Sequence, residues 1–223
     1  MDCISVENMR ESDALTIARY APSLELMGRA AEGVFRAASW QGRTAIVTGS
    51  GNNGGDGFAL ACILRERGYA CAVFTLSEKL SADSAFYAQK ARALGVTVQP
   101  FTPDCLQGFD CVVDCLLGTG FRGGLRDKYR VAIQAINSAG TQVISVDINS
   151  GLDGDTGTCD LAVRSDLTVT IGFLKHGLLT ENAGRYMKRL VCADIGIRLV
   201  REERKITPAD APSWLDLTVI RAY

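Results

Sequence analysis

Short, almost continuously apolar segments recur along most of this chain, and helical patterns separate them. Strands that are buried on both faces of a parallel sheet have this composition. Parallel strands also need long crossovers, which helices usually provide. The sequence therefore predicts an α/β fold, a three-layer α/β/α sandwich with a mostly parallel sheet. The expected strands are TAIVTG (44–49), CAVFTL (71–76), VTVQP (96–100), CVVDCLL (111–117), QVISVDI (142–148), LTVTIGF (167–173) and RLVCADIGI (189–197).

Two N-terminal helices are expected before the first strand. Ser5 can cap the first of them, and Pro22 with Ser23 opens the second, in which apolar residues recur at helical spacing. Further helices are expected up to Gly68, over residues 83–94 and around residues 131–138. No linker or repeat interrupts the chain, so we expect one domain over residues 1–223. The pattern leaves the charged segment from Arg201 and the short tail after it unassigned.

The charge balance argues against several classes of function. The 223 residues include 24 Lys and Arg against 25 Asp and Glu, a net charge of -1, without a block of like charge. We therefore expect neither nucleic acid nor a membrane surface as a partner. The first residues do not resemble a signal peptide, and no apolar run approaches the length of a membrane span. The expected location is the cytoplasm.

Eight cysteines are scattered along the chain, mostly in apolar segments, and none forms a C-x-x-C pair. This distribution is typical of buried, reduced thiols. The single histidine, His176, argues against a zinc site, because such sites usually need several histidine or paired cysteine ligands. A lone histidine beyond a strand is more often a surface or hydrogen-bonded residue than a catalyst.

Three glycine-rich loops follow three of the expected strands. They are SGNNGGDGF (50–58), GTGFRGGLR (118–126) and NSGLDGDTG (149–157). The carboxyl ends of parallel strands share one edge of a sheet, where ligands bind in open α/β folds. We therefore expect the three loops to converge on one crevice.

The first of these loops has the composition of a phosphate-binding turn. Gly49, Gly51 and Gly54 satisfy G-x-G-x-x-G, a weak signal alone, because missing β-carbons let backbone N–H groups approach a phosphate at a helix N-terminus. A plain strand-to-helix turn would not need two amides, a carboxylate and several glycines in a row. We interpret the loop as functional.

Two aspartates occupy positions where a carboxylate needs an explanation. Asp114 interrupts the apolar run VVDCLL, so it must be paired, bound to a cation or hydrogen-bonded to a neighbouring loop. Asp147 ends its strand, a usual place for a catalytic group in this topology, although a turn or helix cap also explains it. The Ser150 hydroxyl that follows can bond a ligand or an adjacent backbone group.

At these residues the chain resembles the NAD(P)H-hydrate epimerase family, also called YjeF N-terminal domain proteins. The resemblance rests on MRESDALTI, GSGNNGGDGFALA, VVDCLLGTGFRGGLR, SVDINSGLDGDTG and LTVTIGFLKHGL leading to ADIGI, which together reach from near the start to about residue 197. It implies a Rossmann-like fold that acts on hydrated NADH or NADPH. The family interconverts the R and S forms at the hydroxyl-bearing ring carbon, so that a partner dehydratase can restore the coenzyme. It also suggests a homodimer.

The resemblance carries over to individual positions. Asp147 matches a residue that contacts substrate, and we assign it proton transfer or its positioning. Asn53, Asp114 and Ser150 match the ligands of one potassium ion. The further positions that match the substrate loops are Asn52, Asn53, Gly54, Gly55, Asp56, Gly118, Thr119, Gly120, Phe121, Arg122, Gly123 and Gly124.

The chain departs from the family pattern at two positions. Arg29 stands where the family often has an asparagine in the second helix, which puts a contact to the site in doubt. Asn149 stands where many members have proline, and we expect it to loosen the third loop while leaving Asp147 and Ser150 in place.

Two other functions compete with epimerisation. An NAD(P)-dependent oxidoreductase shares the glycine fingerprint, and Glu78 lies where a ribose-binding acid is expected. This chain lacks a Tyr-x-x-x-Lys dyad, however, and an oxidoreductase function would leave Asp114 and Asp147 without roles. A non-catalytic nucleotide-binding protein could use the same crevice, but it would be free to lose Asn53, Asp114, Asp147 and Ser150.

Overall fold

The computed structural model describes residues 1–207, 210–212 and 216–223. The tail that the sequence pattern left unassigned contains two strands, β10 and β11, and its residues 208–209 and 213–215 lie outside the described part. In chain order the elements are β1 (Asp2–Ile4), α1 (Val6–Arg19), α2 (Ser23–Ala37), β2 (Arg43–Thr48), α3 (Asn52–Glu66), β3 (Ala70–Thr75), α4 (Ala82–Ala93), β4 (Thr97–Pro100), β5 (Cys111–Cys115), α5 (Asp127–Asn137), β6 (Gln142–Val146), β7 (Leu167–Ile171), β8 (Leu174–Lys175), the 3-10 helices η1 (His176–Leu179) and η2 (Ala183–Arg185), β9 (Arg189–Asp194), β10 (Arg204–Lys205) and β11 (Asp216–Arg221).

Eight strands form the central sheet in the order β11-β9-β7-β6-β5-β2-β3-β4. Every neighbouring pair is parallel, which confirms the predicted sheet. β5 lies between β2 and β6, and in this register Asp114 is opposite Val47 on one side and Ser145 on the other. The carboxyl ends of β2, β5 and β6, which precede the three glycine-rich loops, are therefore adjacent.

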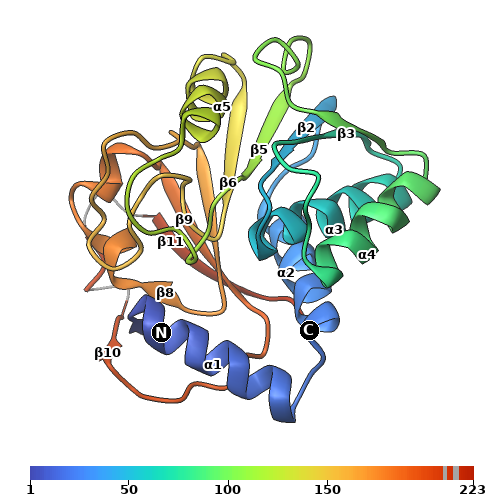
Figure 1. Cartoon of the computed structure of the whole chain (residues 1–223). Helices are drawn as coiled ribbons and strands as arrows, with labels where there is room; N and C mark the ends of the chain where they lie inside the picture. Colours follow the sequence, from blue (N-terminus) through green and yellow to red (C-terminus); the bar gives the residue numbers. More distant parts are fainter. Residues whose placement is uncertain (208–209, 213–215) are drawn as a thin grey trace.

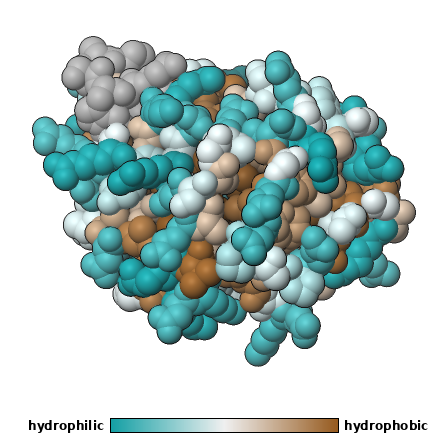
Figure 2. All heavy atoms as spheres, turned by 90° about the horizontal axis from the view of Figure 1, so that it is seen from above, coloured by the Kyte–Doolittle hydropathy of each residue, from teal (hydrophilic) through white to brown (hydrophobic). Residues whose placement is uncertain are grey.

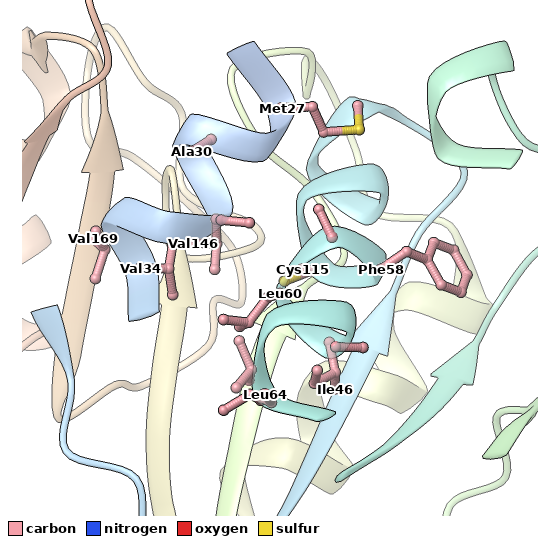
Figure 3. Close-up of a cluster of buried hydrophobic side chains, with 14 of the residues drawn as sticks. Met27, Ala30, Val34, Ile46, Phe58, Leu60, Leu64, Cys115, Val146 and Val169 are labelled. Atoms are coloured by element: carbon pink, nitrogen blue, oxygen red, sulfur yellow. The ribbon is translucent and has the colours of Figure 1, made fainter. Parts of the chain in front are cut away.

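The predicted helices cover the two faces of this sheet unequally. Helices α2, α3 and α4 pack on one face, and α5 packs on the other (Figure 1). On the first face the apolar side of α2 and the buried α3 meet β2, β5, β6 and β7, as the labelled side chains of Figure 3 show. Phe58, Leu60 and Leu64 of α3 are fully buried, which fixes the start of that helix close to the strand ends.

After β6 the layering differs from the predicted alternation of strands and helices. Loops, β8 and two short 3-10 helices connect β6, β7 and β9, without an α-helix in this fully described stretch. A separate apolar cluster covers the sheet here, and Ile148, Leu152, Leu174 and Leu178 belong to it. The chain therefore completes the third layer with buried loop residues.

A second, three-stranded sheet fastens the N-terminus. β1 pairs with β10 in antiparallel fashion and with β8 in parallel. The predicted cap of α1 is confirmed, because the Ser5 hydroxyl accepts a hydrogen bond from the Asn8 amide at 3.2 Å. This arrangement places α1 across one end of the central sheet, beneath it in the view of Figure 1.

The surface and the thiols agree with the composition in part. On the face that Figure 2 shows, hydrophilic side chains surround the apolar areas. None of the helices in the described part of the chain has the length and apolar character needed to cross a bilayer. All eight cysteines are free, as predicted. Five of them are buried, whereas Cys71, Cys105 and Cys159 are only half-buried.

Candidate active site

A cavity of about 540 Å³ opens at the carboxyl ends of β2, β5 and β6. α1 and the start of α2 form one side of it, and the start of α3 with the loop after β5 forms the other. The first two glycine-rich loops thus meet at this cavity, as predicted. The third loop, residues 149–157, does not line it, and that segment of chain reaches the cavity only through Asp147.

Most residues predicted to bind substrate line this cavity. Gly54, Gly55 and Gly123 do not. Gly54 and Gly55 are buried in α3, where a β-carbon on Gly54 would collide with the Gly49 carbonyl, so these glycines allow close packing behind the cavity. The predicted residues that do line it are Asn52, Asn53, Asp56, Gly118, Thr119, Gly120, Phe121, Arg122, Gly124 and Asp147.

Asp147 is held in a single orientation. It is the only non-glycine residue in the described part with a left-handed backbone, at φ 68°. Its Oδ1 accepts a 2.6 Å hydrogen bond from Lys175 Nζ, and its Oδ2 accepts one of 2.8 Å from the Thr119 amide. A β-carbon on Gly118 would lie 2.6 Å from Oδ2, so glycine is needed where the second loop passes this carboxylate.

Lys175 is a site residue that the sequence reasoning missed. Its side chain is fully buried, and besides Asp147 it donates to Thr170 Oγ1 at 2.9 Å and to the Ile171 carbonyl at 2.7 Å. A buried lysine is rare unless it is paired. The signal that could have revealed it was a lysine directly after the apolar run LTVTIGFL.

Three further carboxylates line the cavity: Asp13 on α1, Asp56 on α3 and Asp83 on α4. Burial, and next the negative charge of Asp147, raises the pKa of Asp13, while Lys175 acts in the opposite direction. Burial also dominates at Asp56, where the charges of Asp147 and Asp13 add to it and hold the pKa well above its usual range. Asp56 keeps some solvent contact, although protein atoms surround it densely. Asp13 was not predicted.

Asp114 lies behind the cavity, fully buried, and its carboxylate accepts four hydrogen bonds. Ser150 donates from Oγ at 2.6 Å and from its amide at 2.9 Å, Ser145 Oγ donates at 3.0 Å, and the Leu116 amide donates at 3.1 Å. Burial raises the pKa of Asp114, and these hydrogen bonds oppose the shift. Bonds from a neighbouring loop, one of the predicted explanations, therefore compensate this carboxylate.

The residues predicted to bind potassium converge on the backbone after β5. The Leu117 carbonyl accepts a hydrogen bond from Asn53 Nδ2 at 2.9 Å, and the Leu117 amide donates one of 2.9 Å to Ser150 Oγ, whose own hydrogen goes to Asp114. Asn53 Oδ1 is buried without a hydrogen-bond partner in the described part. An oxygen in that state fits a hard cation, which takes oxygen ligands. The described residues contain no cluster of three His, Cys, Asp or Glu side chains suited to a metal.

Both departures from the family pattern have structural roles outside the cavity. Arg29 donates to the Ile195 carbonyl at 3.0 Å and lies over the ring of Tyr223, so it joins α2 to the end of the chain. The expectation that Asn149 loosens its loop is wrong. Its buried Nδ2 donates to the Val163 and Tyr186 carbonyls and to a serine hydroxyl, and its Oδ1 accepts from Thr168, so it fastens the loop.

His176 lies outside the cavity and has hydrogen-bond partners, as predicted. Its Nε2 is 2.6 Å from Glu203 Oε2, and its Nδ1 is 3.3 Å from Cys3 Sγ. Burial opposes ionisation of Glu203, but hydrogen bonds from His176, Ser5 and Asn8 outweigh it and lower the pKa of Glu203 to about 2. This cluster joins β1 and the start of α1 to the segment before β10.

Comparison with known proteins places these residues in a family context. The NAD(P)H-hydrate epimerase of Limosilactobacillus fermentum is 34% identical over 202 residues, covering 86% of this chain and 95% of that protein. The NAD(P)H-hydrate epimerase of Rhodopirellula baltica is 32% identical over 207 residues, covering 88% and 85%. The bifunctional NAD(P)H-hydrate repair enzyme Nnr of Coxiella burnetii is 35% identical over 196 residues, and the match spans 40% of that longer protein.

A solved structure and a family model complete the comparison. The crystal structure of yeast ynu0 has a TM-score of 0.69 and 21% sequence identity to this chain, and the match covers 79% of this chain and 83% of the yeast chain. That likeness shows a shared fold. The family model described as YjeF-related protein N-terminus matches residues 23–177, and the chain therefore belongs to this family.

Proposed function

We propose that this protein interconverts the R and S forms of hydrated NADH and NADPH. The observation that carries the proposal is the Asp147 carboxylate, which a buried lysine and a loop amide fix at the edge of a cavity between two glycine-rich loops. Two relatives of similar length bear the name NAD(P)H-hydrate epimerase, which supports this reading. The protein would then be an isomerase, and we propose that residues 1–223 form its single domain.

The chemistry of the substrate suits this cavity. The carbon that carries the hydroxyl is bonded to the ring nitrogen, so departure of the hydroxyl as water leaves a planar, positively charged centre. Water that returns to the other face gives the other epimer. Because both Asp147 oxygens already accept hydrogen bonds, we assign this residue the stabilisation and positioning of the positive ring.

The nucleotide part of the substrate would lie across the first two loops. Helix α3 begins at Asn52 without a side-chain cap, so its first backbone N–H groups can bind a phosphate. We place phosphate near residues 52–56 and the rest of the ligand along residues 118–124. A crystal of the protein with hydrated NADPH tests this placement, and a ligand bound at the opposite sheet edge would contradict it.

We further propose one potassium ion held by Asn53, Asp114 and Ser150. The partnerless Asn53 oxygen supports it, and one carboxylate among neutral oxygens suits a singly charged ion. Such an ion would supply positive charge that fixes the loop geometry near the substrate. The test is thermal stability in potassium chloride against the chloride of a bulky organic cation. Equal melting temperatures, with only water at this position in a high-resolution map, would contradict the site.

The functional partner would be a dehydratase that uses one epimer. The bifunctional name of the longer relatives supports a link between the two activities. A cytoplasmic location and a homodimer stay predictions. Sedimentation of the protein at micromolar concentration tests the dimer, which a purely monomeric profile would contradict.

Chiral chromatography of purified hydrate epimers, with the spontaneous interconversion subtracted, tests the activity itself. We expect the Asp147→Asn variant to fold and to lose roughly 10²-fold or more of the rate, because the ring loses its negative partner. Near-normal turnover would remove Asp147 from the reaction. An oxidoreductase would instead change NAD(P)H absorbance with substrate. Glu78, its expected ribose-binding acid, does not line the cavity.

A further inference from the structure

The proposed epimerisation needs a group that gives a proton to the leaving hydroxyl and takes one from the returning water. Asp147 is poorly placed for that task, since Lys175 and the Thr119 amide occupy its two oxygens. A proton donor must carry a proton at the working pH and must reach the cavity. The other carboxylates of the cavity wall are Asp13, Asp56 and Asp83, and burial raises the pKa of Asp13 and Asp56.

Asp13 and Asp56 differ from Asp147 in their surroundings. Both line the cavity, one from α1 and the other from α3. Within the part of the chain that the structure describes, neither side chain has a hydrogen-bond or ion-pair partner, and only the charges of neighbouring groups act on them. Each carboxyl is therefore free to bond a ligand.

The local charge balance favours a proton on one of these two carboxyls. Lys175 is a fully buried cation whose charge lowers the pKa of Asp13 and Asp56, but its ion-pair partner at 2.6 Å is Asp147. Two like charges in a poorly solvated site do not both ionise readily. Burial, and next the charges of Asp147 and Asp13, hold the pKa of Asp56 well above its usual range.

Other charged groups around the cavity do not neutralise the pair. Arg10 of α1 donates to the Thr119 carbonyl at 3.2 Å, and Arg122 lies 4.0 Å from Asp155. Arg126 lines the cavity at the end of the second loop, and Asp83 of α4 adds a negative charge to the cavity wall.

Two neutral titratable groups also feel Asp56. They are Tyr87 on α4 and Cys115 on β5, and the negative charge of Asp56 helps to raise the pKa of each, after the larger effect of burial. Neither group supplies a positive charge to Asp56, so the surroundings as a whole favour its protonated form.

We propose that Asp56 gives and takes the proton of the epimerisation, and that the negative charge of Asp13 keeps Asp56 protonated. The inference rests on the proposed epimerase function. The Asp56 carboxyl transfers its proton to the substrate hydroxyl, the carbon–oxygen bond breaks, and its electron pair leaves with water while the ring nitrogen forms a double bond to the carbon. Water then attacks the other face, the double-bond electrons return to nitrogen, and the water proton passes to the Asp56 carboxylate. No oxidant or reductant takes part.

The roles of the two residues predict different variants. Asp56→Asn keeps the size of the side chain but cannot transfer a proton, so epimerisation falls roughly 10²- to 10⁴-fold. Asp13→Asn removes only a negative charge, so Asp56 loses its proton at a lower pH. The rate should then begin to fall at a lower pH than in the wild type. Asp104→Asn, the same change on an exposed turn outside the cavity, is the control.

The test combines epimerisation rates over a range of pH with carboxyl ¹³C NMR titration of Asp56. The NMR titration needs no catalytic activity, so it separates this inference from the proposed function. We expect Asp56 to titrate well above the usual carboxyl range of about 4 and to move down in Asp13→Asn. A pKa of Asp56 in the usual carboxyl range would overturn the inference. So would full activity of Asp56→Asn in an assay in which the wild type is active. A wild type without epimerisation, but with the expected titration, would contradict the function and the catalytic role while leaving the effect of Asp13 on Asp56 established.

Discussion

Asp114 and Asp56 are two poorly solvated carboxyls near the same strand ends, and they have opposite surroundings. Burial raises the pKa of both. Asp114 accepts four hydrogen bonds from three residues, whereas Asp56 has no hydrogen-bond partner among the described residues. The difference shows that burial alone does not reveal the role of a carboxyl. The hydrogen-bond partners reveal it: Asp114 joins β5 to the third loop, whereas Asp56 is available to a ligand.

The sharpest test of this contrast removes the Asp114 carboxylate. Asp114→Ala leaves the Ser145 hydroxyl and the Ser150 and Leu116 amides without their acceptor. We expect the free energy of unfolding to fall by about 3–5 kcal/mol, measured by urea denaturation. Asp114→Asn keeps one acceptor oxygen and should lose less. A loss below about 1 kcal/mol in the alanine variant would show that the network contributes little.

Asn149 tests whether the neighbouring loop depends on the same kind of network. Asn149→Ala removes contacts to Val163, Thr168 and Tyr186. We expect a loss of roughly 2 kcal/mol in unfolding free energy, because several buried groups lose a partner. Arg29→Ala, which removes contacts far from this loop, serves for comparison. Unchanged stability in Asn149→Ala would mean that other contacts fix the loop.

Asp56 should show the opposite response. Its pKa is raised on folding, so the folded state binds the proton more tightly and stability falls as pH rises above the usual carboxyl range. Asp56→Asn lacks this loss. We expect it to be more stable than the wild type by about 1 kcal/mol at pH 8, with the gap closing towards pH 4, as often occurs when a functional residue is replaced. Thermal unfolding at both pH values measures this, and a destabilised variant at pH 8 would remove the contrast with Asp114.

Glu203 supplies the smallest effect, since it is a hydrogen-bonded carboxyl near the surface. Its pKa is lowered to about 2, so its contribution to stability is complete above the usual glutamate pKa and disappears as pH falls from about 4.3 towards 2. We expect Glu203→Gln to lose less than about 1 kcal/mol at pH 7, because solvent screens the contacts. The difference from wild type should vanish near pH 2. A constant difference across that range would point to packing instead of charge.

Local pattern was sufficient to predict much of the fold and part of the site. The apolar runs predicted the parallel sheet, and the loops after them located Asn53, Asp56 and Asp147 at the cavity. Asp13 could not be found this way, because the position of α1 depends on β1 pairing with β8 and β10, which are far apart in sequence. Those contacts place α1 over the cavity. Lys175 left only a weak local signal, a lysine directly after an apolar run.

The left-handed backbone at Asp147 also limits which sequences this position tolerates. At φ 68° a β-branched or bulky side chain is strained, whereas glycine, asparagine and aspartate adopt the conformation readily. Saturation mutagenesis of position 147 should therefore yield only a few well-folded substitutes. Asparagine alone among them keeps the shape of the side chain. The Asp147→Asn change needs only one nucleotide substitution, and it removes the charge without changing the shape. It is therefore a short route by which a lineage loses activity and retains the fold.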